Sequence, residues 1–328
     1  MDDGRIGVYV HVPFCERVCP YCDFAVVAAR RLPEARERAY VDALLAELVR
    51  RAPEFAGPAG APRPLASLYL GGGTPSLLAP GSIGRLIDAV RAQFPPTADP
   101  EVTLEVNPST TEEGRLPGFR AAGVNRLSIG VQSFSDATLK RLGRAHRGDA
   151  ARAILVAARA AGFSNVSIDL IAAAPGQRLA DLERDLDEAL AFAPQHVSAY
   201  MLTVEPGTPF AQAARRGQLA LAGEEEATAM FDRLAERLEA AGLARYEISS
   251  FARCSAGRGC VWLQTRRYWQ RTAVLGIGMG AWSAEPPSPA APHGARRANL
   301  RGLDAYLARV AAGEPAQAEP PERLDAAM

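Results

Sequence analysis

Three cysteines stand within eight residues close to the beginning of the printed sequence. Cys15, Cys19 and Cys22 form a C-x3-C-x2-C run directly after a stretch rich in Val and Ile. Thiolates at such short spacings let a single loop hold an iron–sulfur cubane. Three protein ligands leave one iron without a cysteine. The spacing therefore predicts a [4Fe–4S] cluster with one coordination position open to another molecule.

Other interpretations of the three cysteines stay open beside this one. A structural zinc ion would need a fourth ligand, and His11 is the nearest candidate. A disulfide would leave one cysteine over, and buried thiols seldom crowd into one loop. The chain has five cysteines, and clustered cysteines in a reducing compartment bind metal more often than they form disulfides. We therefore expect a cluster first and zinc second.

The composition argues against several classes of partner. The chain has 328 residues, of which 48% are hydrophobic, and its formal net charge is zero. Nothing in this balance predicts binding to nucleic acid or to an anionic membrane surface. The first residues lack the basic and apolar regions of a signal peptide, and no uncharged apolar stretch reaches the roughly 18 residues of a membrane span. We expect a cytoplasmic protein without an integral membrane span.

The elements that must position the cysteine loop alternate in type along the chain. Six short β-forming segments are each followed by helical material, and this rhythm predicts a parallel sheet with helices packed outside it. The six predicted strands are Arg5–Val12, Leu65–Leu70, Glu101–Val106, Arg126–Val131, Val166–Ile171 and His196–Thr203. Six units are too few for a closed eight-stranded barrel. The expected fold class is therefore α/β, a partial (β/α)6 barrel open on one side, with its chemistry at the C-terminal ends of the strands.

Helical periodicity marks the segments between and after these strands. The predicted helices are Glu34–Arg51, Ser82–Phe94, Thr111–Ala122, Ser135–Leu142, Asp149–Ala161, Leu179–Phe192, Glu224–Gly242 and Leu303–Ala312. Beyond about residue 205 the rhythm changes. There we predict a short strand at Tyr246–Ser250, an irregular stretch at Ala252–Tyr268 and a Pro- and Ala-rich loop at Ala284–His293.

The same change of rhythm suggests a division of the chain. We expect a barrel core at residues 1–220 and a C-terminal extension at 221–312 that completes this core. Residues 313–328 are rich in Pro, Glu and Ala and are expected to form a disordered tail.

Polar residues and glycines stand where the predicted strands end. The run Gly71–Gly73 could make a tight turn or let a ligand approach the backbone, since no Cβ intervenes. We favour the ligand. Glu105, Gln132 and Asp169 are lone polar residues in apolar strands, where an acid is costly unless it is partnered. Arg144 follows a predicted helix and could grip a carboxylate through two hydrogen bonds, or stand in solvent at the helix end.

These motifs, in this order, resemble the radical S-adenosylmethionine (SAM) family. The similarity is narrower for the branch that contains the oxygen-independent coproporphyrinogen III oxidases and the heme chaperones of the HemW type. The motifs that carry it are Tyr9-Val-His-Val-Pro-Phe-Cys15, Gly71-Gly-Gly-Thr-Pro-Ser76, Leu104-Glu-Val-Asn-Pro108, Asn125-Arg-Leu-Ser-Ile-Gly-Val-Gln-Ser-Phe134, Ile168-Asp-Leu-Ile171, Pro175-Gly-Gln177, Leu202-Thr-Val-Glu-Pro-Gly-Thr-Pro-Phe210, Tyr246-Glu-Ile-Ser249 and Tyr268-Trp269. They extend over roughly residues 5 to 312.

The resemblance implies two cofactors, a [4Fe–4S] cluster and SAM. In the family, the amino and carboxylate groups of SAM chelate the open iron. An electron from the cluster then splits SAM to give an adenosyl radical, while the protein orients the reactants. The residues with implied roles are Cys15, Cys19 and Cys22 as cluster ligands, Tyr9 and Tyr21 beside the cluster, Gly72, Gly73, Thr74 and Glu105 as contacts of this SAM, and Gln132, Arg144 and Asp169 at positions that contact a second SAM in the oxidases.

Two departures distinguish this chain within the branch. The oxidases carry Gly-Cys directly after the third ligand cysteine, whereas this chain has Asp23-Phe24, as the chaperones do. The chaperones usually carry His-Asn-x-x-Tyr-Trp, for which a part in heme binding has been proposed. This chain keeps only Tyr268-Trp269, and a further histidine of the chaperones is replaced by Trp282.

Heme ligation therefore does not transfer directly to this chain. Cys260 could ligate heme through its thiolate, with Cys254 close by in sequence, although inert thiols are the commoner case. His146 and His196 are expected to be structural histidines with satisfied nitrogens.

From the resemblance we expect a protein that binds heme or a porphyrin, delivers it to an acceptor protein and takes electrons from a donor. One alternative is an enzyme, an oxygen-independent coproporphyrinogen III oxidase. Another is a degenerate paralogue that binds a cluster but no tetrapyrrole. The Asp23-Phe24 pair favours the chaperone over the oxidase, and whether the chain is an enzyme stays open. Relatives continue past the region of Leu324 into a small helical domain, which we expect to be absent here.

Overall fold

Six parallel strands follow one another in the predicted order. The computed structural model describes residues 2–255, 258–259, 261–287, 291–318 and 320–325. The parallel strands are β1 (Ile6–Val12), β4 (Leu65–Gly72), β5 (Pro96–Val106), β6 (Arg126–Gln132), β7 (Asn165–Ala172) and β8 (His196–Met201). Each pairs with the next in this order. Among the described residues β1 and β8 do not pair with each other, so the α/β partial barrel expected from the sequence is confirmed.

Side chains alternate between the two faces along most of these strands, as the period of two requires, with register shifts near Leu65 and Gln132. On β6, Leu127, Ile129 and Val131 are fully buried in the hydrophobic core. Arg126 and Ser128 stand between them and face the other way, toward the barrel interior. The other parallel strands repeat the pattern, so an apolar outer face packs under the helices while the interior of the barrel is polar.

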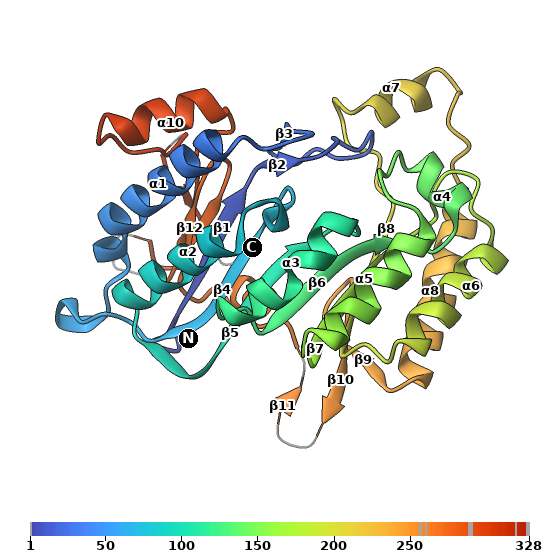
Figure 1. The fold of residues 1–328 in the computed structure, drawn as a ribbon, viewed down its shortest axis with the longest axis horizontal. Coiled ribbons are helices and arrows are strands. Elements are labelled where there is room, and N and C mark those ends of the chain that lie inside the picture. Colours follow the sequence, from blue (N-terminus) through green and yellow to red (C-terminus); the bar gives the residue numbers. More distant parts are fainter. Residues whose placement is uncertain (1, 256–257, 260, 288–290, 319, 326–328) are drawn as a thin grey trace.

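The helices between the strands cover the outer face (Figure 1). They are α1 (Glu34–Arg51), α2 (Pro80–Gln93), α3 (Thr110–Ala121), α4 (Asp136–Arg141), α5 (Gly148–Ala160), α6 (Leu179–Ala191) and α8 (Glu224–Ala240). Two begin at serines, because the Ser109 and Ser135 side chains accept hydrogen bonds from backbone N–H groups of the first turn. The predicted helices at these places are confirmed to within two residues.

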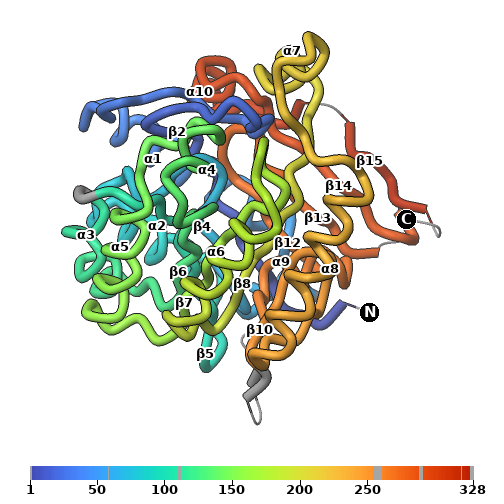
Figure 2. Tube along the Cα trace, turned by 90° about the vertical axis from the view of Figure 1, so that its right-hand side faces the viewer, coloured from blue at the N-terminus to red at the C-terminus, as the bar shows by residue number. Residues whose placement is uncertain are grey.

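The sheet continues beyond the six strands on both sides (Figure 2). β10 (Ser250–Ser255) runs antiparallel to β8, and β12 (Val274–Ile277) runs parallel to β1. The remaining strands are β9 (Leu243–Arg245) and β11 (Arg258–Gly259) beside β10, β13 (Trp282–Glu285), β14 (Ala295–Ala298) and β15 (Glu322–Arg323) after β12, and the separate pair β2 (Phe14–Cys15) and β3 (Val27–Ala28). The sequence did not predict these additions.

Several expectations for the second half of the chain are corrected. The segment Tyr246–Ser250 is not a strand, since only Ser250 belongs to one and the rest forms the turn between β9 and β10. The stretch expected to be irregular contains α9 (Leu263–Trp269). Two more helices are α7 (Pro209–Arg215) and α10 (Leu303–Ala311), and single 3-10 turns lie at Ala52–Phe55, Pro58–Gly60 and Pro75–Leu77.

Part of the stretch expected to be a disordered tail pairs with the sheet. β15 pairs with β14, and the side chain of Ala316 is fully buried. Its carbonyl also accepts a hydrogen bond from the backbone N–H of Leu300. The division of the chain at residues 220 and 312 stays a prediction.

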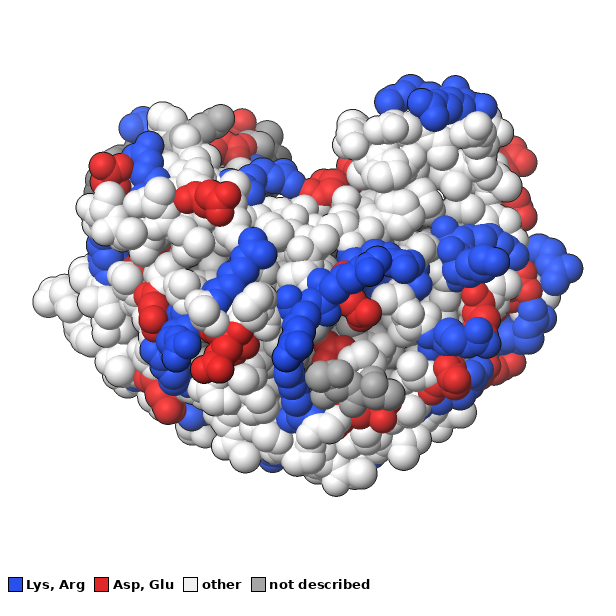
Figure 3. All heavy atoms as spheres, turned by 45° about the horizontal axis from the view of Figure 1, so that its top comes forward, with Lys and Arg blue, Asp and Glu red and all other residues white. Residues whose placement is uncertain are grey.

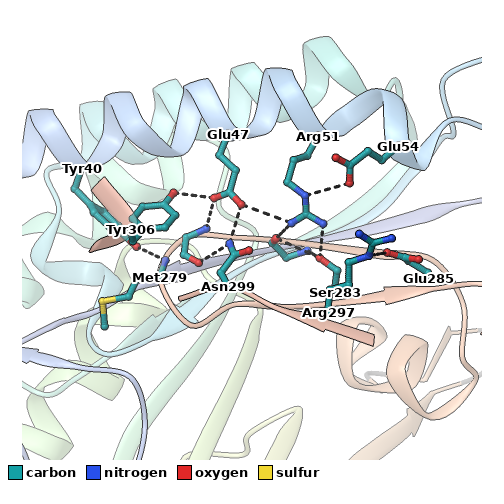
Figure 4. A network of polar contacts seen from close by, with 12 residues as sticks. Tyr40, Glu47, Arg51, Glu54, Met279, Ser283, Glu285, Arg297, Asn299 and Tyr306 are labelled. Atoms are coloured by element: carbon teal, nitrogen blue, oxygen red, sulfur yellow. Dashed lines mark hydrogen bonds and ion pairs between the residues drawn. The ribbon is translucent and has the colours of Figure 1, made fainter. Parts of the chain in front are cut away.

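A buried polar network ties the C-terminal elements to α1 (Figure 4). One Glu47 oxygen accepts hydrogen bonds from the Gly278 N–H (2.8 Å) and the Tyr306 hydroxyl (2.7 Å), and the other accepts one from Asn299 Nδ2 (2.7 Å). Arg51 lies 3.6 Å from the same carboxylate and donates to the Gly276 carbonyl at 2.8 Å. Because Glu47 and Arg51 are both buried, this network fixes how β12, β14 and α10 sit against the helix.

No helix among the described residues combines the length and the apolar character that a membrane crossing demands.

Candidate functional site

A cavity of about 1220 Å³ lies at the C-terminal ends of the parallel strands. Figure 3 shows the molecule hollowed on this side, between two raised parts. All twelve residues to which the family resemblance gives a role line this one cavity: Tyr9, Cys15, Cys19, Tyr21, Cys22, Gly72, Gly73, Thr74, Glu105, Gln132, Arg144 and Asp169. The structure thus brings together residues spread over more than 150 positions of the chain. Cys254 is described only by its backbone, and Cys260 lies outside the described residues.

The three cysteines of the loop after β1 are free thiols. The Thr74 hydroxyl lies 3.8 Å from Cys15 Sγ, and Arg144 Nη1 lies 3.5 Å from Cys19 Sγ. Burial raises the pKa of the Cys15 thiol to about 11 and also raises the pKa of Cys22. Metal binding requires thiolates, so loading a cluster must release these protons.

This arrangement fits a cluster better than a zinc ion. A zinc ion draws four ligands around one point. Both ring nitrogens of His11, the expected fourth ligand, are already engaged: Nε2 donates to the Ala25 carbonyl (2.8 Å) and Nδ1 accepts from the Tyr9 hydroxyl (3.0 Å). In the described part of the chain, no group of three or more His, Cys, Asp or Glu side chains is arranged to hold a metal ion. A cubane spreads its thiolates over separate irons, so its ligands need not converge on one point.

A chain of hydrogen bonds connects two of the cysteines through a residue that the sequence did not single out. Asn107 Nδ2 donates to Thr74 Oγ1 at 2.6 Å, and Asn107 Oδ1 accepts from Arg144 Nη2. Thr74 and Arg144 are the two groups that approach Cys15 and Cys19. Asn107 therefore holds both donors in place. The sequence signal for it was its place in the motif Leu104-Glu-Val-Asn-Pro108, two residues after Glu105 and directly after β5.

Neighbouring elements brace the cysteine loop from outside. The ring of Phe210, on α7, lies 6.0 Å from the ring of Tyr21, and the Phe210 N–H donates to the Pro20 carbonyl at 3.0 Å. Gly143 has a φ of +69°, and a Cβ there would lie 2.5 Å from Pro20. Glycine is therefore required at this position, because α4 ends directly against the loop.

The glycines after β4, which line the cavity, also leave room for close contacts with other segments of the chain. Gly72 has a φ of +108°, and a Cβ there would lie 2.5 Å from the His11 ring. A Cβ on Gly73 would lie 2.8 Å from backbone atoms of Val12, Pro13 and Phe14. The backbone of the cysteine loop can therefore cross the end of β4 only because these side chains are missing.

Glu105 is held by donors on both of its oxygens. The Tyr69 hydroxyl donates to Oε1 at 2.5 Å, and the Gly72 N–H donates to Oε2 at 3.0 Å. Burial raises the pKa of this carboxyl to about 7, and the nearby Asp169 acts in the same direction. Within the described residues no cation pairs with Glu105. A carboxyl with a pKa near 7 is present in both its neutral and its ionised form at neutral pH. It is therefore suited to accept hydrogen bonds or a positive group from a ligand.

Gln132 and Asp169 line the cavity from β6 and β7. Gln132 has a φ of +64°, which is a strained conformation for a residue with a side chain and is typical of functional positions. Asp169 accepts hydrogen bonds from the hydroxyls of Ser128 (3.1 Å) and Ser167 (3.2 Å). These hydrogen bonds offset part of the free energy needed to bury a carboxyl within a strand. Burial still raises the pKa of Asp169.

The C-terminal extension supplies an aromatic side to the same cavity. Trp262, Tyr268 and Trp282 all line it. The Trp262 ring lies 4.7 Å from the ring of Tyr69, and the Arg296 guanidinium lies 5.6 Å from the ring of Trp282. The sequence noted Tyr268 only as the remnant of a motif and Trp282 only as the replacement of a histidine, whereas the structure places both in the wall of the cavity that the cysteines line.

An open parallel barrel whose cavity is lined by three clustered cysteines and by polar residues is typical of one class of protein. Comparison with known proteins identifies that class. The model of the radical SAM superfamily matches residues 9–189. The chain belongs to the radical SAM superfamily and, within it, to the family of proteins named heme chaperone HemW.

Two relatives and one solved structure illustrate this membership. The chain is 37% identical to the heme chaperone HemW of Escherichia coli over 276 residues, which covers 84% of this chain and 69% of that protein. It is 38% identical to the HemW of Mycobacterium tuberculosis over 281 residues, covering 86% and 70%. Coproporphyrinogen III oxidase (HemN) of E. coli, a radical SAM enzyme, shares the fold with a TM-score of 0.79 at 26% identity, covering 98% of this chain and 72% of HemN.

Proposed function

We propose that Cys15, Cys19 and Cys22 hold a [4Fe–4S] cluster and that SAM occupies the cavity wall beside them. Membership in the radical SAM superfamily supports this proposal, as does the gathering of the three thiols at one cavity. When bound, SAM would supply an adenosyl radical after reduction by the cluster. In this arrangement Thr74 and Arg144 donate toward the ligand sulfurs, and such donors tune the cluster.

The wall residues take the other roles in this proposal. Glu105 and the backbone of Gly72 and Gly73 would meet one SAM, with Tyr9 and Tyr21 flanking the cluster. Gln132 and Asp169, together with Arg144, would meet a further part of SAM or a second SAM. Their chemistry suits the purpose, since the group combines acceptors, donors and a guanidinium around one space.

We propose further that the chain binds heme in this cavity and passes it to an acceptor protein, with electrons supplied by a donor protein. Its relatives carry the name heme chaperone. The observation that carries the proposal here is the aromatic side formed by Trp262, Tyr268 and Trp282. Flat aromatic surfaces of this kind stack on planar ring systems. The volume, about 1220 Å³, exceeds that of pockets for a single small ligand, which reach roughly 1,000 Å³.

Titration of the chain with heme tests this proposal. We expect a saturable shift of the Soret band with about one heme per chain. Trp282→Ala should weaken the binding about tenfold, since an aromatic ring that stacks on the heme would contribute on the order of 1 kcal/mol or more. The exposed Trp269, which does not line the cavity, provides the matched control as Trp269→Ala. The proposal is wrong if the wild-type chain produces no Soret shift.

The second candidate function is oxidation of a porphyrinogen. It is favoured by the similarity to HemN over 98% of the chain. The pair Asp23-Phe24, in place of the Gly-Cys of the oxidases, speaks against it. Turnover of coproporphyrinogen III under anaerobic conditions, without a Soret shift on heme addition, would reverse the order of the two candidates.

SAM binding is expected to strengthen as the pH rises through about 7. Burial raises the pKa of Glu105 to about 7, and only its ionised form accepts hydrogen bonds freely on both oxygens. The dissociation constant should therefore be about tenfold lower at pH ~8 than at pH ~6, because the ionised fraction changes by that factor. Equilibrium dialysis with the cluster-loaded chain measures it.

Two variants separate this effect from general pH sensitivity. Glu105→Gln cannot ionise and should bind SAM with little dependence on pH. Tyr69→Phe removes a hydroxyl that lowers the pKa of Glu105, so the midpoint should move up by about 1 pH unit. An unchanged pH profile in Glu105→Gln would rule out this role of the carboxylate.

A further inference from the structure

The chain has four histidines, and the structure distinguishes them by their free ring nitrogens. His11 uses both nitrogens, as described above. His196 also uses both, since Nδ1 bonds the Ser167 hydroxyl at 2.8 Å and Nε2 bonds the Tyr246 hydroxyl at 2.9 Å. His293 is exposed and does not line the cavity. These three residues therefore offer no nitrogen to a ligand in the cavity.

His146 differs from the other three. It lines the cavity two residues after Arg144, and its Nε2 lies 3.1 Å from the Val131 carbonyl. A carbonyl oxygen only accepts hydrogen bonds, so Nε2 must carry the proton. The lone pair then lies on Nδ1, which has no hydrogen-bond partner among the described residues. Burial, together with the nearby Arg144, lowers the pKa of His146 to about 4, so the ring is neutral at pH 7.

This is the arrangement by which proteins prepare a histidine for a metal. Histidines that bind a metal nearly always donate their other ring N–H to a carbonyl or carboxylate, which fixes the tautomer and the orientation of the ring. The bond to Val131, at the end of β6, supplies that support here. The sequence led us to expect a structural histidine at this position, and only the tertiary contact shows one nitrogen left over.

We infer that Nδ1 of His146 would ligate the iron of a heme bound in the cavity. This inference rests on the proposed function and deepens it. It also supplies a histidine ligand in a sequence that lacks the His-Asn pair and a later histidine of the chaperones. Gln264 and Thr265, which precede Tyr268 where the His-Asn pair would stand, line the same cavity but offer no imidazole.

The test uses the full chain, loaded with its cluster and kept free of oxygen, titrated with ferric heme. Ligation is read by EPR and by resonance Raman spectroscopy with excitation in the Soret band. The oxidised cluster is diamagnetic, so the EPR of the ferric heme can be observed separately. We expect a histidine-ligated spectrum for the wild-type chain and the same spectrum for the control His293→Ala.

Variants of His146 give the decisive readout. His146→Ala should lose the histidine signature and bind heme at least tenfold more weakly, and added imidazole should restore the ligation. His146→Cys should bring a thiolate signature that His146→Ala lacks, which shows that the ligand comes from this position. An unchanged spectrum in His146→Ala overturns the inference but leaves heme binding intact. A loss of SAM affinity with unaltered heme ligation does the same, whereas failure of the wild-type chain to bind heme overturns both the inference and the proposed function.

Discussion

Cys19→Ala is expected to abolish assembly of a [4Fe–4S] cluster on this chain. Anaerobic reconstitution of the wild-type chain should give about four irons and four sulfides per chain, with an EPR signal after reduction that SAM perturbs. Without Cys19, two thiolates would have to hold the whole cubane. His11 cannot replace the lost ligand, because both of its ring nitrogens are engaged. Iron and sulfide analysis together with EPR measures the loss.

A matched control separates ligand loss from the general loss of a thiol. Cys254→Ala removes a cysteine outside the C-x3-C-x2-C run and should retain the full iron content and the response to SAM. Two results would contradict the cluster proposal: full iron content in Cys19→Ala, or one zinc and no iron in the wild-type chain.

Glu47→Ala is expected to lower the free energy of unfolding by about 3–5 kcal/mol, the usual cost of removing one partner from a buried ion pair. The loss leaves the buried Arg51 with only the partly exposed Glu54 as an ionic partner. It also leaves the Gly278 N–H and the Tyr306 hydroxyl without their acceptor, and it removes one of the two acceptors of the Asn299 amide. For a chain of this length the melting temperature should fall by about 4–8 °C. Differential scanning calorimetry measures it.

The same helix contains an ideal control. Glu34 and Arg38 form a pair with the same i,i+4 spacing and the same 3.6 Å separation as Glu47 and Arg51, but both side chains are exposed. Glu34→Ala should therefore change the melting temperature by only about 1 °C, because exposed pairs contribute little. Equal effects of the two substitutions would show that burial of the network does not contribute to stability.

The Glu47 network also bears on the candidate site. It anchors β12, β14 and α10, and Trp282 of β13 and Arg296 of β14 line the same cavity as the cysteines. A weakened network should therefore loosen the aromatic side of the cavity while leaving the cysteine loop in place. In Glu47→Ala we expect heme affinity to fall more than iron content.

Much of the barrel was predictable because its signals are local. Each parallel strand carries a run of apolar residues at alternate positions, and each helix carries the 3.6-residue period, so neighbours in sequence identify the element. The chemistry at the mouth was predictable for the same reason. In parallel barrels the C-terminal ends of all strands meet on one side, so Glu105, Gln132 and Asp169 had to converge once the strands were recognised.

The additions to the sheet were not predictable in this way. Strands such as β12 and β13 have four residues each and little periodicity of their own. They form because the edge of β1 presents unpaired backbone groups, and this edge exists only after the barrel has folded. The segment at Tyr246 shows the converse: its residues favour a strand, but the chain must turn there to bring β10 against β8.

The sequence by itself determined the class of chemistry, since the cysteine spacing, the glycines and the strand-end polar residues can be read along the chain. Tertiary structure decided which of these groups have partners. Asn107 bridges Thr74 and Arg144, both of the His11 nitrogens are engaged, and one nitrogen of His146 is left open. Hydrogen bonds to elements distant in sequence set these states, because the availability of a nitrogen or carboxylate depends on what the folded chain places within about 3 Å of it.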